Sequence, residues 1–320
     1  MRAVRSHDHH VHVVDVPEPS GDGVVVRIAS AGICGSDLHL VDLYDLQVTL
    51  GHEFAGFLPD GRLVAVESLG ACRTCGPCIA GRPYHCERGL RMYGGALHGG
   101  MAERCLVDPR TIVPLDGVEP RDASLVEPLA VAVHAVRLAG TSLGSSGSLA
   151  GSSVVVLGGG SIGLCVVAAL QAVGVERVDL VARHPHQREA ADRLGAHLVG
   201  PEPDRWDVVV DAVGTAESLA QAVDAVRPGG TVVVVGLFWS PSVPMPGLAF
   251  CTKEVRLVAS MMYGSGASGR DVDHAARLLA SRPELGPTLI THRFPLDAAA
   301  EAFACARDRS AGAIKVVLEP

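Results

Sequence analysis

Hydrophobic positions between residues 150 and 240 alternate between short continuous runs and helical repeats. Apolar runs at 153–157, 177–182, 207–211 and 231–235 are typical of buried strands. Residues spaced by three or four predict helices at 164–173 and 216–226. Because strands that alternate with helices form parallel sheets covered on both faces, this part of the chain is expected to be an α/β domain.

The first 120 residues have a different pattern, in which short apolar runs at 24–28 and 101–107 are separated by glycine and proline turns. Near Asp122 the pattern changes to that of a helix, which contains Glu127. A turn is expected at 227–230, a further helix at 271–281 and a last strand at 314–318. The first region is therefore expected to be β-rich, and the final stretch to return to it.

The most apolar stretch, 154–175, is long enough to raise the question of a membrane span. Gly158, Gly159, Gly160 and Gly163 interrupt it, however. A strand, a turn and a buried helix explain the stretch better, so we expect no membrane association.

The glycines form a Gly-x-Gly-x-x-Gly motif between an expected strand and an expected helix. In this setting Gly158 allows a tight turn, Gly160 lets backbone amides approach a pyrophosphate, and Gly163 lets the helix pack on the strand. We predict that this loop, with Ser161 and Ile162, binds a dinucleotide.

The end of the second expected strand distinguishes the two nicotinamide coenzymes. An acid there would bind the ribose hydroxyls of NAD, whereas a small residue followed by arginine accommodates the 2′-phosphate of NADP. Asp179 lies mid-strand, and the strand ends in Ala182-Arg183-His184. We therefore favour NADP(H) over NAD(H). The remaining predicted coenzyme contacts are Ala182, Arg183, His184, Arg188, Val213 and Gly236.

Four of the nine cysteines lie within fifteen residues, at Cys72, Cys75, Cys78 and Cys86. Two overlapping Cys-x-x-Cys steps and nearby glycine and proline turns can bring four thiolates together around one ion. Four thiolates leave no open coordination position. We predict a structural zinc in a lobe at about 70–88, rather than disulfides or a redox site.

A second potential metal site combines distant residues. Cys34, His52, Glu53 and Glu127 supply the thiolate, imidazole and carboxylates that zinc selects, and three protein ligands leave a position open for chemistry. His7, His9, His10 and His12 could also be imagined as a metal tract, but alternate histidines on a surface strand are the simpler interpretation.

Bulk composition excludes several classes of partner. The formal net charge is −8, so no broad cationic surface for nucleic acid or anionic lipid is expected. The N-terminal residues lack the apolar core of a secretory signal, and clustered thiols suit a reducing compartment, so we expect a cytoplasmic protein. The only lysines are Lys253 and Lys315, which we attribute to compositional bias.

Taken together, these motifs resemble the zinc-dependent medium-chain dehydrogenase/reductase superfamily, which includes alcohol, sorbitol and threonine dehydrogenases. The resemblance runs almost end to end, through 34–37, 51–53, the four-cysteine lobe, 126–129, the glycine loop, 227–230 and 312–317. It implies a GroES-like catalytic domain, residues 1–129 and 264–320, and a doubly wound Rossmann domain, residues 130–263. It also implies two zinc ions per chain and a homodimer or homotetramer.

Carried over to this sequence, the resemblance implies that Cys34 and His52 bind the catalytic zinc. The third protein contact can be Glu53 or Glu127, directly or through water. Zinc would act as a Lewis acid on the substrate oxygen. Ser36 is placed to accept the hydroxyl proton and His39 to pass it outward, whereas Asp37 is expected to orient a metal ligand.

The expected activity is interconversion of a secondary alcohol, such as a polyol or amino alcohol, with its ketone. One alternative is a protein that binds zinc and a dinucleotide without turnover, and another is the zinc-free quinone reductase branch. The presence of Cys34, Ser36, His52, Glu53 and Glu127 argues against both. Tyr44, Trp239 and Met262 are candidate pocket residues, but they do not identify the substrate.

Overall fold

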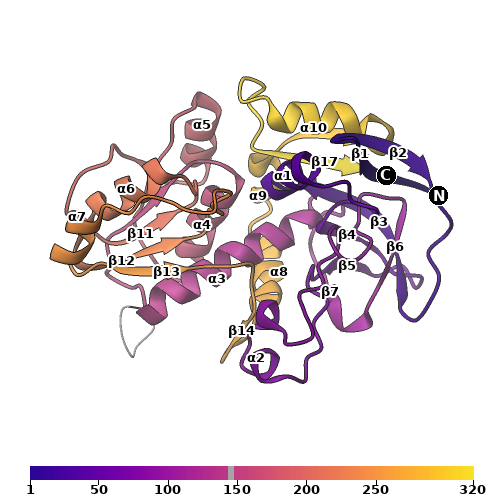
Figure 1. The fold of residues 1–320 in the computed structure, drawn as a ribbon, viewed down its shortest axis with the longest axis horizontal. Helices are drawn as coiled ribbons and strands as arrows, with labels where there is room; N and C mark the ends of the chain where they lie inside the picture. The colour runs from indigo at the N-terminus through magenta and orange to yellow at the C-terminus, as the bar shows by residue number, and fades with distance from the viewer. Residues whose placement is uncertain (143–147) are drawn as a thin grey trace. The chain divides into compact units, whose positions relative to one another are not determined.

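The computed structural model describes residues 1–142 and 148–320. The chain divides into two compact units. Unit 1 comprises Met1–Glu127 and Gly264–Pro320, and unit 2 comprises Pro128–Tyr263 (Figure 1).

Unit 1 is built on a seven-stranded, mainly antiparallel sheet. The strand β3 (Val24–Ile33) is longer than the apolar run that predicted it, and pairs with β4 and β17 near its end and with β6 near its start. The other strands of this sheet are β4 (Glu53–Phe57), β5 (Leu63–Val66), β6 (Arg104–Val107), β7 (Ile112–Pro114), β16 (Ile290–Pro295) and β17 (Lys315–Glu319). Two small hairpins complete the β structure: β1 (Arg2–His7) with β2 (His10–Asp15), and β14 (Ser265–Gly266) with β15 (Gly269–Arg270).

Short helices connect these strands. They are α1 (Gly35–Leu43), α2 (Gly76–Ile79), α8 (Asp271–Ser281), α9 (Leu285–Leu289) and α10 (Ala299–Arg307), with 3-10 turns η1 (Pro83–His85), η2 (Pro109–Thr111), η3 (Ala123–Leu125) and η4 (Leu296–Ala298). The predicted limits of the helix at 271–281 are confirmed by α8. The core contains Val26, Phe54, Met101 and Phe303, each almost fully buried.

Unit 2 contains a six-stranded parallel sheet in the order β10-β9-β8-β11-β12-β13. Its strands are β8 (Val154–Leu157), β9 (Val178–Val181), β10 (His197–Leu198), β11 (Trp206–Asp211), β12 (Val226–Val234) and β13 (Arg256–Ala259). Its helices are α3 (Val126–Ser142), which begins two residues before the unit, α4 (Ser161–Ala172), α5 (Pro185–Arg193), α6 (Ala216–Ala225) and α7 (Gly247–Thr252). This strand order is that of a doubly wound dinucleotide-binding fold, so the predicted fold class is confirmed.

The expected turn at 227–230 differs in detail, because β12 runs through it. The ladder between β11 and β12 nevertheless jumps there, from the pair Trp206–Val226 to the pair Val208–Thr231. The glycines and the proline therefore form an irregularity at the start of a strand instead of a separate turn.

Two apolar segments of membrane-spanning length form parts of the fold. The stretch 154–175 forms β8 and α4, as predicted. Within 1–142 and 148–320, one helical segment, Ala123–Ser142, is long and apolar enough to span a bilayer. Because 78% of its most apolar window is buried within the protein, it has the character of a core helix.

Candidate active site and coenzyme site

The first predicted metal ligand lies where β3 passes into α1. Cys34 has an extended backbone (φ −89°, ψ 153°) and precedes the helix as its N-cap. Its N–H donates to Oδ2 of Asp37 at 2.9 Å, and Asp37 is completely buried. The Asp37 carboxylate therefore holds the turn that presents the Cys34 thiol.

The same carboxylate approaches the second ligand. Oδ1 of Asp37 lies 3.1 Å from Nδ1 of His52, an ion-pair distance without the angles of a hydrogen bond. Burial lowers the pKa of His52, but Asp37, assisted by Cys34, outweighs burial and raises the pKa well above its ordinary value. Since Asp37 lies against Nδ1, Nε2 is the nitrogen available to a metal ion.

Glu53 is held by an unexpected partner, Lys315. The Lys315 ammonium donates to both Glu53 oxygens, at 2.8 and 2.7 Å, and to the Ile33 carbonyl at 3.2 Å. Both side chains are buried, with 4% and 1% of their surface exposed. The sheet brings them together because β3 lies between β4, which begins with Glu53, and β17, which begins with Lys315.

Gly32 makes room for this carboxylate. A Cβ atom at position 32 would lie 2.2 Å from Oε2 of Glu53, so the carboxylate would have to leave its place beside Lys315. Gly32 is also the cross-strand partner of Glu53 in the β3–β4 ladder. Glycine at this position is therefore a requirement of the site rather than of a turn.

The donor atoms fit zinc. The ligand atoms of Cys34, His52 and Glu53 all lie within 4.8 Å of one another, and a thiolate, an imidazole and a carboxylate form a typical catalytic zinc set. Glu127 lies outside this group, although it is buried. Burial raises the pKa of Glu127 to about 8, while the positive His52 lowers it and Glu53 raises it further.

The predicted proton route has one close contact. The Ser36 hydroxyl lies 3.4 Å from Nε2 of His52, within α1 and half-buried. His39 lies one helical turn further along α1 and is exposed. Among the candidate pocket residues, Tyr44 is 56% exposed and follows α1 directly. Trp239 and Met262 belong to unit 2.

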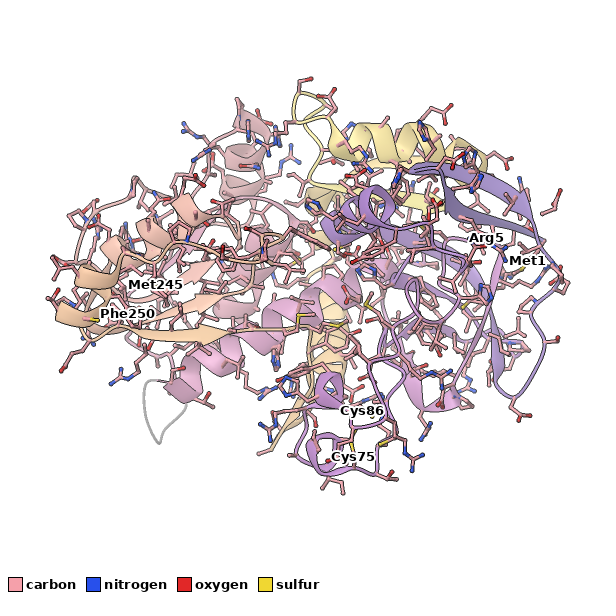
Figure 2. The ribbon with its side chains drawn as sticks, viewed as in Figure 1. Met1, Arg5, Cys75, Cys86, Met245 and Phe250 are labelled. Atoms are coloured by element: carbon pink, nitrogen blue, oxygen red, sulfur yellow. The ribbon has the colours of Figure 1, made fainter. Side chains whose placement is uncertain are left out.

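The four clustered cysteines also converge. The sulfurs of Cys72, Cys75, Cys78 and Cys86 lie within 4.8 Å of one another (Figure 2 labels Cys75 and Cys86). The Cys72 and Cys78 sulfurs are 3.9 Å apart. Zn–S bonds of 2.3 Å at tetrahedral angles require sulfurs about 3.8 Å apart, whereas a disulfide requires about 2.05 Å. This loop therefore fits a four-thiolate zinc site.

Two of the four thiols differ in how easily they lose a proton. Hydrogen-bond donors favour the thiolate form of Cys72, whereas burial disfavours the thiolate form of Cys78. The N–H and hydroxyl of Thr74 and the N–H of Cys75 donate to the Cys72 sulfur and lower its pKa to about 5. Burial raises the pKa of Cys78 to about 12. A bound divalent cation would compensate for this difference, since metal binding requires all four thiolates.

The histidines near the N-terminus do not form one tract. His7 lies with Asp8 and Asp45 at an exposed turn, with ligand atoms within 4.8 Å of one another. His9 instead contacts the Val41 carbonyl through Nδ1 at 3.3 Å, and His10 contacts the Asp8 carbonyl. Exposed groups of this kind are common without a metal.

In unit 2 the glycine loop joins β8 to α4. Gly158 has a φ of +101°, and Gly160 is the N-cap of α4 with open space beside it. A Cβ at Gly163 would lie 1.8 Å from the Gly158 carbonyl oxygen. The Ser161 hydroxyl is buried without a hydrogen-bond partner. A helix N-terminus with open glycine and an unpaired hydroxyl fits a pyrophosphate. Ile162 follows in the first turn of the helix.

The loop after β11 packs against this turn. A Cβ at Gly158 would lie 2.7 Å from Cγ2 of Val213, and a Cβ at Gly236 would lie 2.3 Å from the Gly214 nitrogen. Asp211 fixes the loop, because Oδ1 accepts from the N–H groups of Val213 and Gly214 at 2.9 and 3.2 Å. These contacts bring Gly158, Val213 and Gly236 together at the carboxyl ends of β8, β11 and β12.

The predicted phosphate-binding residues follow β9. Ala182 is buried, Arg183 is exposed, and His184 is the N-cap of α5. Arg188 donates through Nε to the Ala182 carbonyl at 3.1 Å. Asp179 is engaged elsewhere: it accepts from Trp206 Nε1 at 2.9 Å and from Arg177 at 2.8 Å. A buried, doubly bonded Asp179 is not available to a ribose.

Sequence reasoning overlooked Lys315 and Asp211. Lys315 has one signal in the sequence, since a lysine within an apolar last strand of a lysine-poor chain suggests a buried partner. Asp211 ends a strand three residues before Gly214, but no pattern distinguishes it from any other strand-terminal acid.

Two protein-family models match the chain. The alcohol dehydrogenase GroES-like domain matches residues 20–117, and the glucose dehydrogenase C-terminus matches residues 121–319. The chain is 31% identical over 317 residues to L-galactonate-5-dehydrogenase of Escherichia coli, covering 90% of this chain and 89% of that protein.

Solved structures give the same result. A candidate zinc-binding dehydrogenase from Sinorhizobium meliloti, bound to NADP, is 30% identical with a TM-score of 0.84, covering 100% of this chain and 99% of that one. L-idonate 5-dehydrogenase of Escherichia coli is 26% identical with a TM-score of 0.87, covering 100% and 97%.

Proposed function

The chain belongs to the zinc-dependent medium-chain dehydrogenase/reductase family and is an NAD(P)-dependent dehydrogenase acting on CH–OH donors, and from this we propose that it oxidises a polyhydroxylated secondary alcohol with NADP. The observation that carries the proposal is the convergence of Cys34, His52 and Glu53 in one buried site. Two similar proteins act, by name, on L-galactonate and L-idonate, which supports a polyol or sugar acid as the substrate class.

We assign Cys34, His52 and Glu53 as the protein ligands of the catalytic zinc, and Glu127 as a group that acts through water. Glu53 is preferred because its oxygen lies with the other two ligand atoms, whereas Glu127 does not. The four cysteines of the lobe would hold a second, structural zinc. When bound, the catalytic zinc supplies a Lewis acid for the substrate oxygen and the coenzyme supplies the hydride acceptor.

The chain's own residues would move the proton. Ser36 Oγ lies next to the ligand His52 and is proposed to accept the proton of the substrate hydroxyl. His39, exposed one turn further along the helix, would release the proton to solvent. General acid–base assistance of this kind typically contributes about 10²–10⁴ in rate.

NADP is preferred over NAD because the end of β9 presents Arg183 and no available acid. Asp179 is already bonded to Trp206 and Arg177. The Sinorhizobium meliloti structure contains NADP, which supports the same preference.

We also propose a homodimer, because β13 is an edge strand whose outer side has no partner among residues 1–142 and 148–320. Leu257 on this strand is 38% exposed. Such an edge can pair with a second copy of itself. The cytoplasm remains the proposed compartment, since free thiols persist in reducing surroundings.

A screen of polyols, sugar acids and amino alcohols with zinc-loaded protein, run in parallel with NAD and NADP, tests this function. We expect turnover of at least one polyol or sugar acid, with kcat/KM higher for NADP. Cys34→Ser should abolish turnover. Turnover of none of these substrates would favour the non-catalytic alternative.

The coenzyme preference has its own test. Arg183→Ala should raise KM for NADP about tenfold or more, through loss of a charge-assisted contact, and leave KM for NAD unchanged. Arg193→Ala, exposed at the end of α5, the helix that follows Arg183, is the matched control. A wild-type protein that prefers NAD would show that Arg183 does not bind the 2′-phosphate of NADP.

A further inference from the structure

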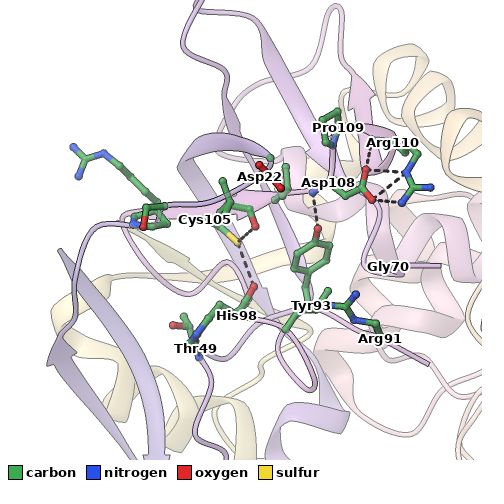
Figure 3. Close-up of a pocket in the computed structure, with 18 of the residues that line it drawn as sticks. Asp22, Thr49, Gly70, Arg91, Tyr93, His98, Cys105, Asp108, Pro109 and Arg110 are labelled. Atoms are coloured by element: carbon green, nitrogen blue, oxygen red, sulfur yellow. Dashed lines mark hydrogen bonds and ion pairs between the residues drawn. The ribbon is translucent and has the colours of Figure 1, made fainter. Parts of the chain in front are cut away.

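Unit 1 contains a cavity of about 960 Å³ that is lined by Cys72 and Cys86 of the cysteine lobe but by none of the proposed catalytic residues (Figure 3). Its walls come from β1, the segment 16–23, the segments 86–93 and 97–99, and the region 104–110. The cavity is not lined by Cys34, His52, Glu53 or Glu127. It is therefore separate from the dehydrogenase site.

The cavity is lined by five arginines and three acidic residues. Two arginines are neutralised within the wall: Arg104 binds Glu18 at 3.0 Å, and Arg110 binds Asp108 at 2.5 Å. The other three, Arg5, Arg88 and Arg91, form no ion pair with a described residue. Asp22, the third acid, is exposed and equally unpaired. The wall thus has an excess of unpaired positive charge.

Arg5 carries the strongest sign of a missing acceptor. Its Nε is buried and has no hydrogen-bond partner. A buried donor without an acceptor costs about 1–3 kcal/mol, and more when it is charged. An anion in the cavity would remove this cost.

Two further donor side chains, Arg91 and His98, line the same cavity as Arg5. Burial lowers the pKa of His98, and the positive charge of Arg5 lowers it further. Nδ1 of His98 accepts from the Thr49 N–H at 3.1 Å, which leaves the ring proton of the neutral histidine on Nε2 as a donor. The N–H of Leu97 donates to the Met92 carbonyl at 3.0 Å, and this short turn joins the segments that carry Arg91 and His98 into the cavity wall.

Part of the wall is apolar. Leu97, Leu106 and Val107 line it, together with the buried ring of Tyr93. The Tyr93 hydroxyl accepts from the Asp108 N–H at 2.9 Å, and its ring packs edge-on against Phe54. Inorganic phosphate or sulfate would leave this surface uncovered, whereas a carbon skeleton would cover it.

We propose that this cavity binds a small organic anion, whose carboxylate or phosphate group contacts Arg5, Arg91 and His98. The anion's carbon skeleton lies against Tyr93 and Leu97. The site binds without any covalent step, and it does not depend on the proposed substrate or on the preferred coenzyme.

The test is titration calorimetry on zinc-loaded protein saturated with NADP, so that phosphate groups cannot enter the coenzyme site. The probes are succinate, phenyl phosphate and inorganic phosphate, which carry no alcohol to oxidise and chelate zinc only weakly. We expect succinate or phenyl phosphate to bind, and inorganic phosphate to bind at least tenfold more weakly. Binding of succinate alone would identify a carboxylate site, and binding of phenyl phosphate alone a phosphate site.

Arg5→Met and Arg91→Met should each weaken binding of the anion about tenfold or more, because each removes one charge-assisted contact. Arg309→Met is the control: Arg309 is exposed and does not line the cavity, so its replacement should change binding less than twofold. Circular dichroism and alcohol oxidation without the anion report folding. If Arg5→Met does not fold, Arg91→Met decides. Absence of binding by all probes, or binding unchanged in the variant that folds, would overturn the proposal. If the wild-type protein oxidised none of the tested alcohols, the proposed function would fail, but the proposal of an anion site would stand.

Discussion

Lys315 and Glu53 show how a single buried ion pair constrains a site. Glu53 accepts both hydrogen bonds from one ammonium, and no water-exposed surface screens the pair. Removing one partner of such a pair leaves an uncompensated charge in the interior, which is more costly than never having the pair. Lys315 thus controls the charge and position of a proposed zinc ligand.

We predict that Lys315→Met lowers the free energy of unfolding by about 3–5 kcal/mol, because the Glu53 carboxylate is left buried and unpaired. Urea unfolding of the protein freed of zinc, in which Glu53 has no other cation, measures this. Lys253→Met is the matched control, since Lys253 donates to the carbonyls of Val223 and Asp224 and pairs with Asp204, which is exposed. It should cost about 1 kcal/mol. Equal losses in the two variants would contradict a special role for Lys315.

The zinc content of two variants should show which of Glu53 and Glu127 is the zinc ligand. Glu53→Gln should leave one zinc fewer per chain after dialysis against a weak chelator, because a ligand is lost. Glu127→Gln should retain zinc but lower activity about 10–100-fold, as expected of a group that contacts the zinc through a water molecule. Mass spectrometry of the metals and steady-state rates give both readings. The reverse pattern would make Glu127 the ligand.

At the scale of elements, the cysteine lobe is a long loop with little regular structure. Besides its sulfurs, the ion pair of Arg73 with Glu67 at 2.6 Å and the Ser265 N–H bond to the Gly81 carbonyl at 2.9 Å anchor it. These few contacts make the lobe dependent on its metal.

We predict that Cys75→Ser removes one zinc per chain and makes the loop between Cys72 and Cys86 susceptible to trypsin, because three thiolates hold the ion poorly. Metal analysis and limited proteolysis measure the two effects. Cys251→Ser, at an exposed cysteine outside the lobe, should change neither. Retention of full zinc in Cys75→Ser would show that the four sulfurs do not act together.

Sequence reasoning succeeded where signals are local. The helix at 271–281, the glycine loop and the cysteine spacing are each encoded within about twenty residues. It failed where contacts are distant, as between Glu53 and Lys315, which lie 262 residues apart. Backbone pairing also extended β3 to Ile33 and carried β12 through the expected turn. Ladder partners, not local propensity, decide such boundaries.

At the scale of the whole molecule, the edge strand β13 offers a route to a dimer. Leu257→Lys should give a protein of half the mass in light scattering, because a charge on an edge strand disfavours pairing. Leu198→Lys is the control: it lies on the opposite edge strand, β10, and is 39% exposed. A wild-type monomer, or a dimer unaffected by Leu257→Lys, would exclude this edge.

The position of β17 beside β3 has a consequence for the order in which the protein forms. Unit 2 is continuous in the chain, so its sheet can close as soon as residue 263 has left the ribosome. Unit 1 cannot complete its sheet, or place Lys315 on Glu53, until residue 315 has been synthesised. The end of β3 that pairs with β17, residues 31–33, therefore remains an open strand edge throughout the synthesis of the inserted domain.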